Sequence, residues 1–289
     1  MELGVSRKRR LLIPRTLWIA WHQGLQTAPS LVQACSRRWS ALNPSWSVRV
    51  VTYDNWSDWL PAAALQRYHT LPELKPAHQA DWLRLQLLLH HGGVWADATV
   101  LCRQQLDAWL PNRCEESFFA FANPGPDRLL SNWFLASSPD HPLIQHWSKR
   151  YEQLLRYPRP RWCKPLQKPL RRWLKTHLKH SPHAARIWCH PLTHRLSAHL
   201  PYFGQHYCFA EIIRTQPSLR VLWRSVPTLS AGPCHWLQHH ADGGDAGSGA
   251  APRNKPTLDQ APVFKLNRRI NTPDQAGVRA ELEHNDGGV

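Results

Sequence analysis

The segment from residue 77 to 99 constrains the fold most, because two glycines join a helical pattern to a buried strand. Apolar residues recur at helical spacing as far as His91, and Gly92-Gly93 supplies the stop that ends a helix. Val94-Trp95-Ala96 then has the apolar character of a short buried strand, and Asp97 follows at its exit. The segment therefore predicts an α/β fold with a carboxylate at the end of a strand.

The beginning of the chain predicts the same class of fold. Residues 16–21 form an apolar run typical of a buried strand, residues 29–42 carry apolar side chains at helical spacing, and residues 46–51 alternate as a strand does. A strand–helix–strand opening favours a sheet that binds ligands at the carboxyl ends of its strands. We also expect a helix over residues 56–68 and strands over residues 118–121 and 263–267.

We expect one domain over residues 11–270, preceded by a basic arm at 1–10 and followed by a polar, loose tail at 271–289. Residues 242–256 are rich in Gly, Ala, Ser and Pro, which is typical of a flexible insertion. No apolar run reaches the ~18–20 residues of a membrane span, and no apolar stretch with a cleavage site follows the basic start. The seven cysteines contain no CxxC pair, so a cytoplasmic protein with reduced thiols is predicted.

Positive charge is the unusual feature of the composition. Lys and Arg number 36 against 20 Asp and Glu, a formal net charge of +16, and 27 of the bases are Arg. Residues 149–195 alone hold 13 Lys and Arg with one acid, Glu152. Such a balance indicates an anionic partner, namely nucleic acid, an anionic membrane surface or a phosphate-bearing substrate, although an Arg bias also follows from genome composition. The basic stretch could bind an anionic acceptor or a phospholipid surface, and a solvated helical face is as consistent with the pattern as these two together.

Three side chains in the 77–99 segment have the chemistry of a sugar-diphosphate site. Asp81 and Arg84 are three residues apart on the expected helix and share one of its faces. Arg84 only donates hydrogen bonds and ionised Asp81 only accepts them, so together they can hold a ligand with many hydroxyls. Asp97, with the Thr99 hydroxyl two residues on, can hold a divalent cation directly or through water, and that cation would neutralise a diphosphate. Taken singly, each feature is more often a solvated helix pair or a turn residue.

The spacing D-x-x-R…G-G-x-W-x-D-A-T over residues 81–99 resembles the bacterial capsular polysaccharide synthesis proteins. These are similar to the glycosyltransferases with a DXD sugar-binding motif and a GT-A fold. Residues 13–24, 35–44, 131–136 and 263–266 resemble further blocks of that family. The resemblance is dense over about residues 11–140 and continues in patches to about 270. It implies a GT-A-like (Rossmann-like) α/β domain with a mostly helical, basic C-terminal part.

The resemblance also implies roles for residues that would bind the donor. Trp21 would stack on the nucleobase at the end of the first strand, and Asp54 would lie near the base or ribose. Asp81 and Arg84 would contact the donor sugar. Asn132 would touch the donor or the acceptor, although a cap or turn position is the plainer interpretation for that residue.

The resemblance places a divalent cation, Mn²⁺ or Mg²⁺, at Asp97 and Thr99, bound directly or through water. Thr99 stands where the plain DXD pattern has its second acid, so the site has one negative charge less. His235 lies in a stretch that resembles a late block of the family and is a further candidate site residue. Asp97 and Arg84 are the residues expected to take part in catalysis.

The predicted function is a glycosyltransferase, hexosyltransferase-like and retaining by resemblance. It would move a sugar from a nucleotide-diphosphate donor to a hydroxyl of a saccharide or glycolipid acceptor in capsular or surface polysaccharide synthesis. Peripheral contact with the anionic inner face of the membrane is a further expectation. The alternatives are a basic nucleic-acid-binding protein and a non-catalytic saccharide-binding relative. Nucleic acid is disfavoured because the charge is concentrated after residue 148 and not around the Trp-rich strands.

Overall fold

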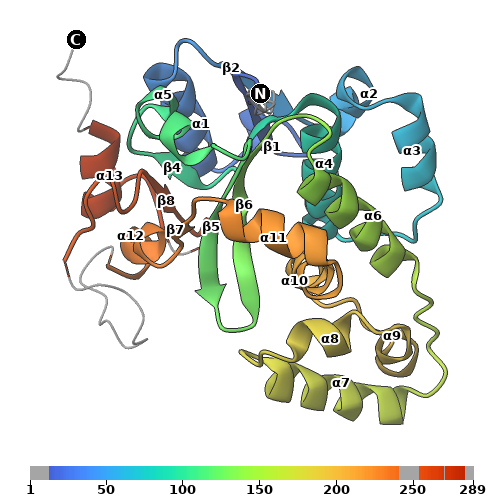
Figure 1. Cartoon of the computed structure of the whole chain (residues 1–289). Coiled ribbons are helices and arrows are strands. Elements are labelled where there is room, and N and C mark those ends of the chain that lie inside the picture. The colour runs from blue at the N-terminus through green and yellow to red at the C-terminus, as the bar shows by residue number, and fades with distance from the viewer. Residues whose placement is uncertain (1–12, 241–253, 270, 284–289) are drawn as a thin grey trace, which may run out of the picture.

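The computed structural model describes residues 13–240, 254–269 and 271–283, which form an α/β fold on a mixed six-stranded sheet (Figure 1). The strand order is β2-β1-β3-β6-β5-β7, with β1 parallel to β2 and β3, and β6 antiparallel to β3 and β5. β4 and β8 pair separately. The strands are β1 (Thr16–Ala20), β2 (Ser47–Val51), β3 (Gly93–Ala96), β4 (Val100–Cys102), β5 (Phe118–Gly125), β6 (Arg128–Ser137), β7 (Leu229–Ser230) and β8 (Val263–Lys265). The predicted α/β class is confirmed.

Helices cover both faces of the sheet, because successive strand residues point to opposite sides. On one face, Trp18 and Trp95 pack with α4 and α6, and on the other, Leu17 and Ile19 pack with α1. The helices are α1 (Ser30–Leu42), α2 (Trp56–Trp59), α3 (Ala62–His69), α4 (Pro76–His91), α5 (Leu106–Trp109), α6 (Pro142–Arg156), α7 (Lys164–Leu178), α8 (Ala184–Trp188), α9 (Pro191–Ser197), α10 (Gly204–Thr215), α11 (Pro217–Ser225), α12 (Trp236–His240) and α13 (Ala276–Glu283).

Two expected elements differ in the structure. The helix expected at 56–68 is divided into α2 and α3 at Leu60-Pro61, where Leu60 is extended because the residue before a proline is pushed out of the helical region. The tail expected to be loose contains α13, whose Val278 is fully buried. The basic arm at 1–10 and most of the insertion at 242–256 lie outside the described residues.

The glycine pair after α4 sets the start of β3 against β1. Gly92 and Gly93 have φ angles of 64° and 91°, a region that favours glycine. A Cβ on Gly93 would lie 2.5 Å from the carbonyl oxygen of Thr16, so a larger residue would push β3 away from β1. The pair therefore fixes where Asp97 emerges, four residues later.

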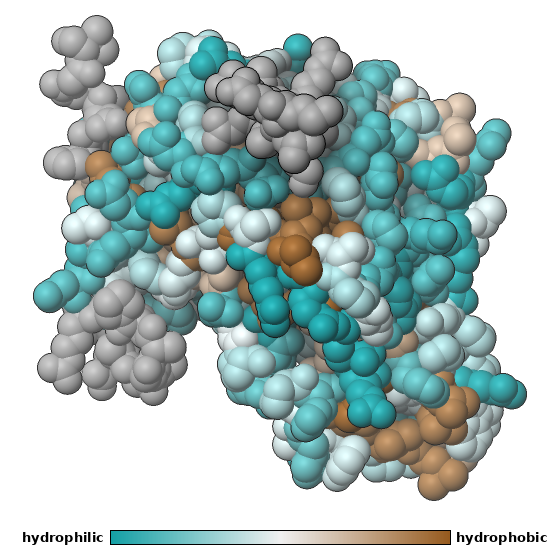
Figure 2. Space-filling model, in the orientation of Figure 1, coloured by the Kyte–Doolittle hydropathy of each residue, from teal (hydrophilic) through white to brown (hydrophobic). Residues whose placement is uncertain are grey.

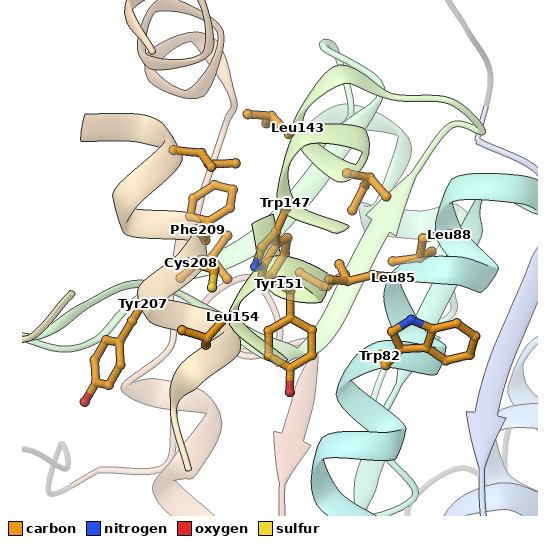
Figure 3. Packing of buried hydrophobic residues seen from close by; sticks show 14 of the residues in the cluster. Trp82, Leu85, Leu88, Leu143, Trp147, Tyr151, Leu154, Tyr207, Cys208 and Phe209 are labelled. Carbon is orange, nitrogen blue, oxygen red and sulfur yellow. The ribbon is translucent and has the colours of Figure 1, made fainter. Parts of the chain in front are cut away.

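A core of large side chains joins α4, α6 and α10 (Figure 3). Trp147 of α6 is fully buried among them, and its indole N–H donates to the backbone oxygen of Gln205 in α10 at 2.7 Å. The indole N–H of Trp82 in α4 donates to the side-chain carboxylate of Glu152 in α6 at 3.1 Å. These contacts hold Gln205 at a fixed distance from α4, which carries Asp81 and Arg84.

The basic C-terminal part is mostly helical, as the sequence predicts. Helices α7, α8 and α9 form a separate layer beyond α10 (Figure 1). None of the helices in the described part of the chain has the length and apolar character needed to cross a membrane.

Candidate active site

Asp97 lies at the carboxyl end of β3 and is held by three donors. Its Oδ1 accepts from Arg84 Nη2 at 2.8 Å and from Trp95 Nε1 at 3.0 Å, and its Oδ2 lies 3.2 Å from Lys265 Nζ. The backbone N–H of Asp97 donates to the oxygen of Trp133, which continues the pairing of β3 with β6. Backbone and side chain of Asp97 are therefore both fixed.

Asp81 and Arg84 form a buried ion pair on α4, as their spacing predicts. Arg84 Nη1 donates to Asp81 Oδ1 at 2.8 Å, and the two side chains are 4% and 10% exposed. The Arg84 guanidinium also lies over the ring of Trp95, 4.9 Å from its centroid. Arg84 thus joins both carboxylates, so the three residues predicted to converge do converge.

Asn132 belongs to the same network, and it is not the cap or turn residue that its sequence context suggested. It lies within β6, and its Nδ2 donates to Asp81 Oδ1 at 3.0 Å and to Gln205 Oε1 at 2.6 Å. Gln205 accepts from Arg84 Nη1 at 2.7 Å and donates to the backbone oxygen of Asp81 at 2.6 Å. Sequence reasoning missed Gln205, because it reaches the site from α10, more than a hundred residues beyond Asp81, and no local motif surrounds it.

Lys265 was also missed, although it lies in the 263–266 block noted for its resemblance. β8 pairs with β4, and Leu266 N–H donates to the oxygen of Thr99. This register places Lys265 Nζ 2.7 Å from Thr99 Oγ1 while it also faces Asp97. Lys265 therefore bridges the carboxylate and the hydroxyl.

Lysine occupies the position where a divalent cation was expected. Both oxygens of Asp97 and the hydroxyl of Thr99 face nitrogen donors, and a metal ion on Asp97 Oδ2 and Thr99 Oγ1 would lie against the Lys265 ammonium. In the described ranges, no cluster of three or more His, Cys, Asp or Glu side chains is arranged to bind a metal. The residues present do not fit the predicted Mn²⁺ or Mg²⁺ site.

The two cations keep Asp97 ionised. Burial by itself raises the pKa of Asp97, but the charges of Lys265 and Arg84 and the hydrogen bonds from Trp95 and Lys265 outweigh burial and hold that pKa below its usual value. The formal charges of the network balance, because it contains two carboxylates, one guanidinium and one ammonium group.

The network faces solvent through only some of its members. The side chains of Asp97 and Lys265 are 28% and 19% exposed, whereas Arg84 is almost fully covered. Asp97 and Lys265, with the half-buried Asn132, are therefore the members of the network that solvent can reach. Direct contact of Asp81 and Arg84 with a donor sugar, which the resemblance implied, does not fit this burial, because both side chains point into the network.

Trp21 and Asp54 lie at the same edge of the sheet but outside these contacts. They follow β1 and β2, which run parallel to β3, so the three strands end on one side. Trp21 is half-buried, and the Arg268 guanidinium lies 5.5 Å from its ring centroid. Asp54 is exposed in a short 3₁₀ turn.

His235 is not joined to the network by a hydrogen bond. It contacts Gln238 at 3.2 Å and packs edge-on against Trp133, and burial lowers its pKa to about 4. Trp133 directly follows Asn132 in β6 and packs in the core on the α1 face of the sheet, whereas Asn132 faces Asp81 of α4. His235 therefore lies on the face of the sheet opposite to Asn132.

One protein family matches more than half of the chain, and several known glycosyltransferases are similar to it. Residues 2–158 match the family described as capsular polysaccharide synthesis protein. Over 158 residues the chain is 30% identical to a glycosyltransferase, afumC, of Aspergillus fumigatus and 25% identical to an O-glycosyltransferase, PaGT, of Phomopsis amygdali. Each alignment covers 48% of this chain, and the chain spans only 40% and 38% of those relatives. The solved PaToxG glycosyltransferase aligns over 74% of each chain with 12% identity and a TM-score of 0.43.

Proposed function

The chain belongs to the capsular polysaccharide synthesis protein family, and from this premise we propose that it is a glycosyltransferase. It moves a sugar from a nucleotide-diphosphate donor to a hydroxyl of a saccharide or glycolipid acceptor, in capsular or surface polysaccharide synthesis. The proposal includes that the transferred sugar is a hexosyl group and that its anomeric configuration is retained. NMR of the product tests the configuration. The observation that carries the proposal is the solvent-facing pair of Asp97 and Lys265 at the carboxyl end of parallel strands.

The donor in this proposal lies along the edge formed by the ends of β1, β2 and β3. Its nucleobase stacks on Trp21 and its ribose lies near Asp54. Its diphosphate lies between Trp21 and Asp97, beside the segment that carries Lys265 and Arg268. That placement brings two cations to the group on which negative charge develops.

Lys265 can serve the diphosphate without leaving its present partners. An ammonium group has three N–H donors, and Asp97 and Thr99 use two of them. The third has no acceptor among the described residues, so it can donate to a phosphate oxygen, and this contact strengthens as the bond to the anomeric carbon breaks. Lys265 therefore supplies the positive charge for the leaving group, and no step in this mechanism runs through a metal ion.

The remaining residues of the network act on the sugar or on one another. The carboxylate of Asp97 offsets the positive charge that develops at the anomeric carbon. Asn132 has its amide on the half-buried side of the site and contacts a sugar hydroxyl. Arg84 and Asp81 are positioning residues, since each acts through Asp97, Asn132 or Gln205.

Donor turnover tests the proposal. Purified protein is incubated with a panel of nucleotide sugars, in EDTA, and release of nucleoside diphosphate is measured. Asp97→Asn should lower the rate by roughly 10²- to 10³-fold, the usual cost of losing one charge-stabilising group. Asp259→Asn is the matched control, because Asp259 is exposed and its carboxylate forms no hydrogen bond or ion pair with the other described residues. Undiminished turnover by Asp97→Asn, with an unchanged melting temperature, removes Asp97 from the mechanism.

A further inference from the structure

A large basic pocket opens beside the candidate active site. Its volume is about 1010 Å³, at the upper end of the ~300–1,000 Å³ typical of ligand sites. It lies between the start of α4, the tip of the β5–β6 hairpin and the chain from Arg156 to Tyr207. His78 lines the pocket and lies 3.8 Å from Asp81 Oδ2, so the pocket and the network share a wall.

The pocket concentrates the charge that the sequence places at 149–195. Eight bases line it, and six of them come from that stretch: Lys75, Arg128, Arg156, Arg159, Arg161, Arg171, Lys175 and Lys179. Only two acids, Glu73 and Asp127, line it as well. Asp127 already accepts from Tyr207 at 3.0 Å and from Arg128 at 3.2 Å.

Most of this charge is not neutralised within the protein. Arg156 pairs with Glu152, and Arg159 donates to the backbone oxygens of Leu154 and Leu155. Within the described ranges, five of the lining bases have no recorded side-chain hydrogen bond or ion pair: Lys75, Arg161, Arg171, Lys175 and Lys179. Partial burial lowers the pKa of Lys175, and the charges of Arg171 and Lys75 lower it further.

Aromatic side chains alternate with the bases around the pocket. Tyr157, Trp188, Tyr202, Phe203 and Tyr207 all line it. Tyr202 lies near the candidate active site, because it precedes Gln205 by only three residues and Gln205 belongs to the network. Aromatic faces with a few charged groups among them suit sugar rings that carry anionic substituents.

We propose that this pocket binds the acceptor, and that the acceptor is a saccharide carrying phosphate or carboxylate groups. The bases of α7 hold its anionic substituents, and the aromatic side chains pack against its rings. Its reacting hydroxyl enters the active site past His78 and Tyr202. The proposal rests on the proposed glycosyl transfer and adds the chemical class of the second substrate.

A lipid surface is the competing partner, and it would use a different face of α7. Trp162, Leu166 and Trp173 are 54%, 60% and 54% exposed, and apolar atoms gather at the lower edge of the molecule, where Figure 1 places α7 (Figure 2). None of the three lines the pocket. The pocket-lining bases Arg171 and Lys175 therefore distinguish the two partners.

Two double variants of α7 provide the test. Arg171→Gln with Lys175→Gln removes two charges from the pocket. Lys168→Gln with Arg172→Gln removes two exposed charges from the same helix that do not line the pocket. Both variants lose two positive charges. The non-specific attraction between the protein and any polyanion is therefore weakened equally in the two variants.

Binding is measured by calorimetry with three oligosaccharides and one vesicle. Hexagalacturonate carries carboxylates, phosphorylated maltohexaose carries phosphate, and maltohexaose is neutral. Vesicles of phosphatidylcholine and phosphatidylglycerol test the lipid surface. We expect one of the anionic oligosaccharides to bind the wild type, and the pocket variant to bind it about tenfold more weakly than the control variant does.

Two results overturn the proposal: binding of maltohexaose as tight as that of both anionic oligosaccharides, or equal weakening in the two variants. Vesicle binding by a wild type that binds neither anionic oligosaccharide also overturns it in favour of lipid, and that binding should weaken in the control variant, which loses charges outside the pocket. Release of nucleoside diphosphate from the donor alone is measured in parallel and should be the same in both variants. If the wild type shows no such release, the proposed function fails, whereas a failure of oligosaccharide binding alone leaves donor turnover intact.

Discussion

Replacing Lys265 by methionine removes the ammonium group and keeps most of the side-chain stem. In the structure Lys265 Nζ lies 2.7 Å from Thr99 Oγ1 and 3.2 Å from Asp97 Oδ2, in a side chain that is 19% exposed. A preorganised donor that faces developing negative charge contributes about 2.7–4 kcal/mol to the transition state. We therefore expect Lys265→Met to release nucleoside diphosphate from the donor about 10²- to 10³-fold more slowly.

The pH profile of the Lys265→Met variant distinguishes this role from loss of structure. Burial raises the pKa of Asp97, and Lys265 is the largest of the influences that lower it. Without Lys265 that pKa rises, so the acid limb of the rate profile moves to higher pH. Lys149→Met is the matched control, because Lys149 is an exposed lysine of α6, and it should change neither rate nor profile. A Lys265→Met rate within about threefold of wild type, with an unshifted acid limb, refutes the role.

Two further predictions concern stability. His141 caps α6 through its ring Nδ1, and burial lowers its pKa to about 4, so the unfolded state takes up its proton first as the pH falls. Above about pH 6.5, His141 should not affect the free energy of unfolding. Between pH 6.5 and about pH 4, that free energy should fall by up to roughly 3 kcal/mol. Urea melts of His141→Asn should lack this pH-dependent loss. Arg103 donates to Glu281 of α13 at 3.0 Å in a buried pair, so Arg103→Met should lower the free energy of unfolding by about 3–5 kcal/mol. A loss under about 1 kcal/mol would show that α13 does not depend on this pair.

Local sequence patterns predicted the strands and helices that carry Asp81, Arg84 and Asp97. Helical spacing up to His91, the glycine pair and the apolar run that follows correspond to α4 and β3. Since a helix of this kind places residues three apart on one face, the contact between Asp81 and Arg84 also follows from spacing. These features depend on neighbours in the sequence, and for that reason they could be predicted.

The other members of the site depend on tertiary packing, which sequence patterns do not reveal. Gln205 reaches the network because Trp147 holds α10 against α6. Lys265 reaches it because β8 pairs with β4 in one register. A shift of one residue in that pairing would turn Lys265 to the other face of the sheet and leave Thr99 without its donor. The residues around Asp97 do not fit the expected metal site for the same reason, since the cation beside Asp97 comes from a distant strand.

The basic stretch at 149–195 shows how structure narrows an open alternative. Composition alone left three alternatives open for these residues, namely an anionic acceptor, a lipid surface and a solvated helical face. The structure turns six of the thirteen bases toward one pocket beside Asp81, and it turns Trp162, Leu166 and Trp173 away from it. The charge therefore has a defined location next to the candidate active site, which composition could not provide.

A crystal structure with a nucleoside diphosphate bound is the most direct measurement. The ligand is chosen from the donor panel by its ability to raise the melting temperature, since binding to the native state stabilises it. The account predicts a phosphate oxygen within hydrogen-bonding distance of Lys265 Nζ, and the nucleobase against Trp21. A nucleotide bound away from Asp97, for example in the basic pocket beside α7, would contradict it.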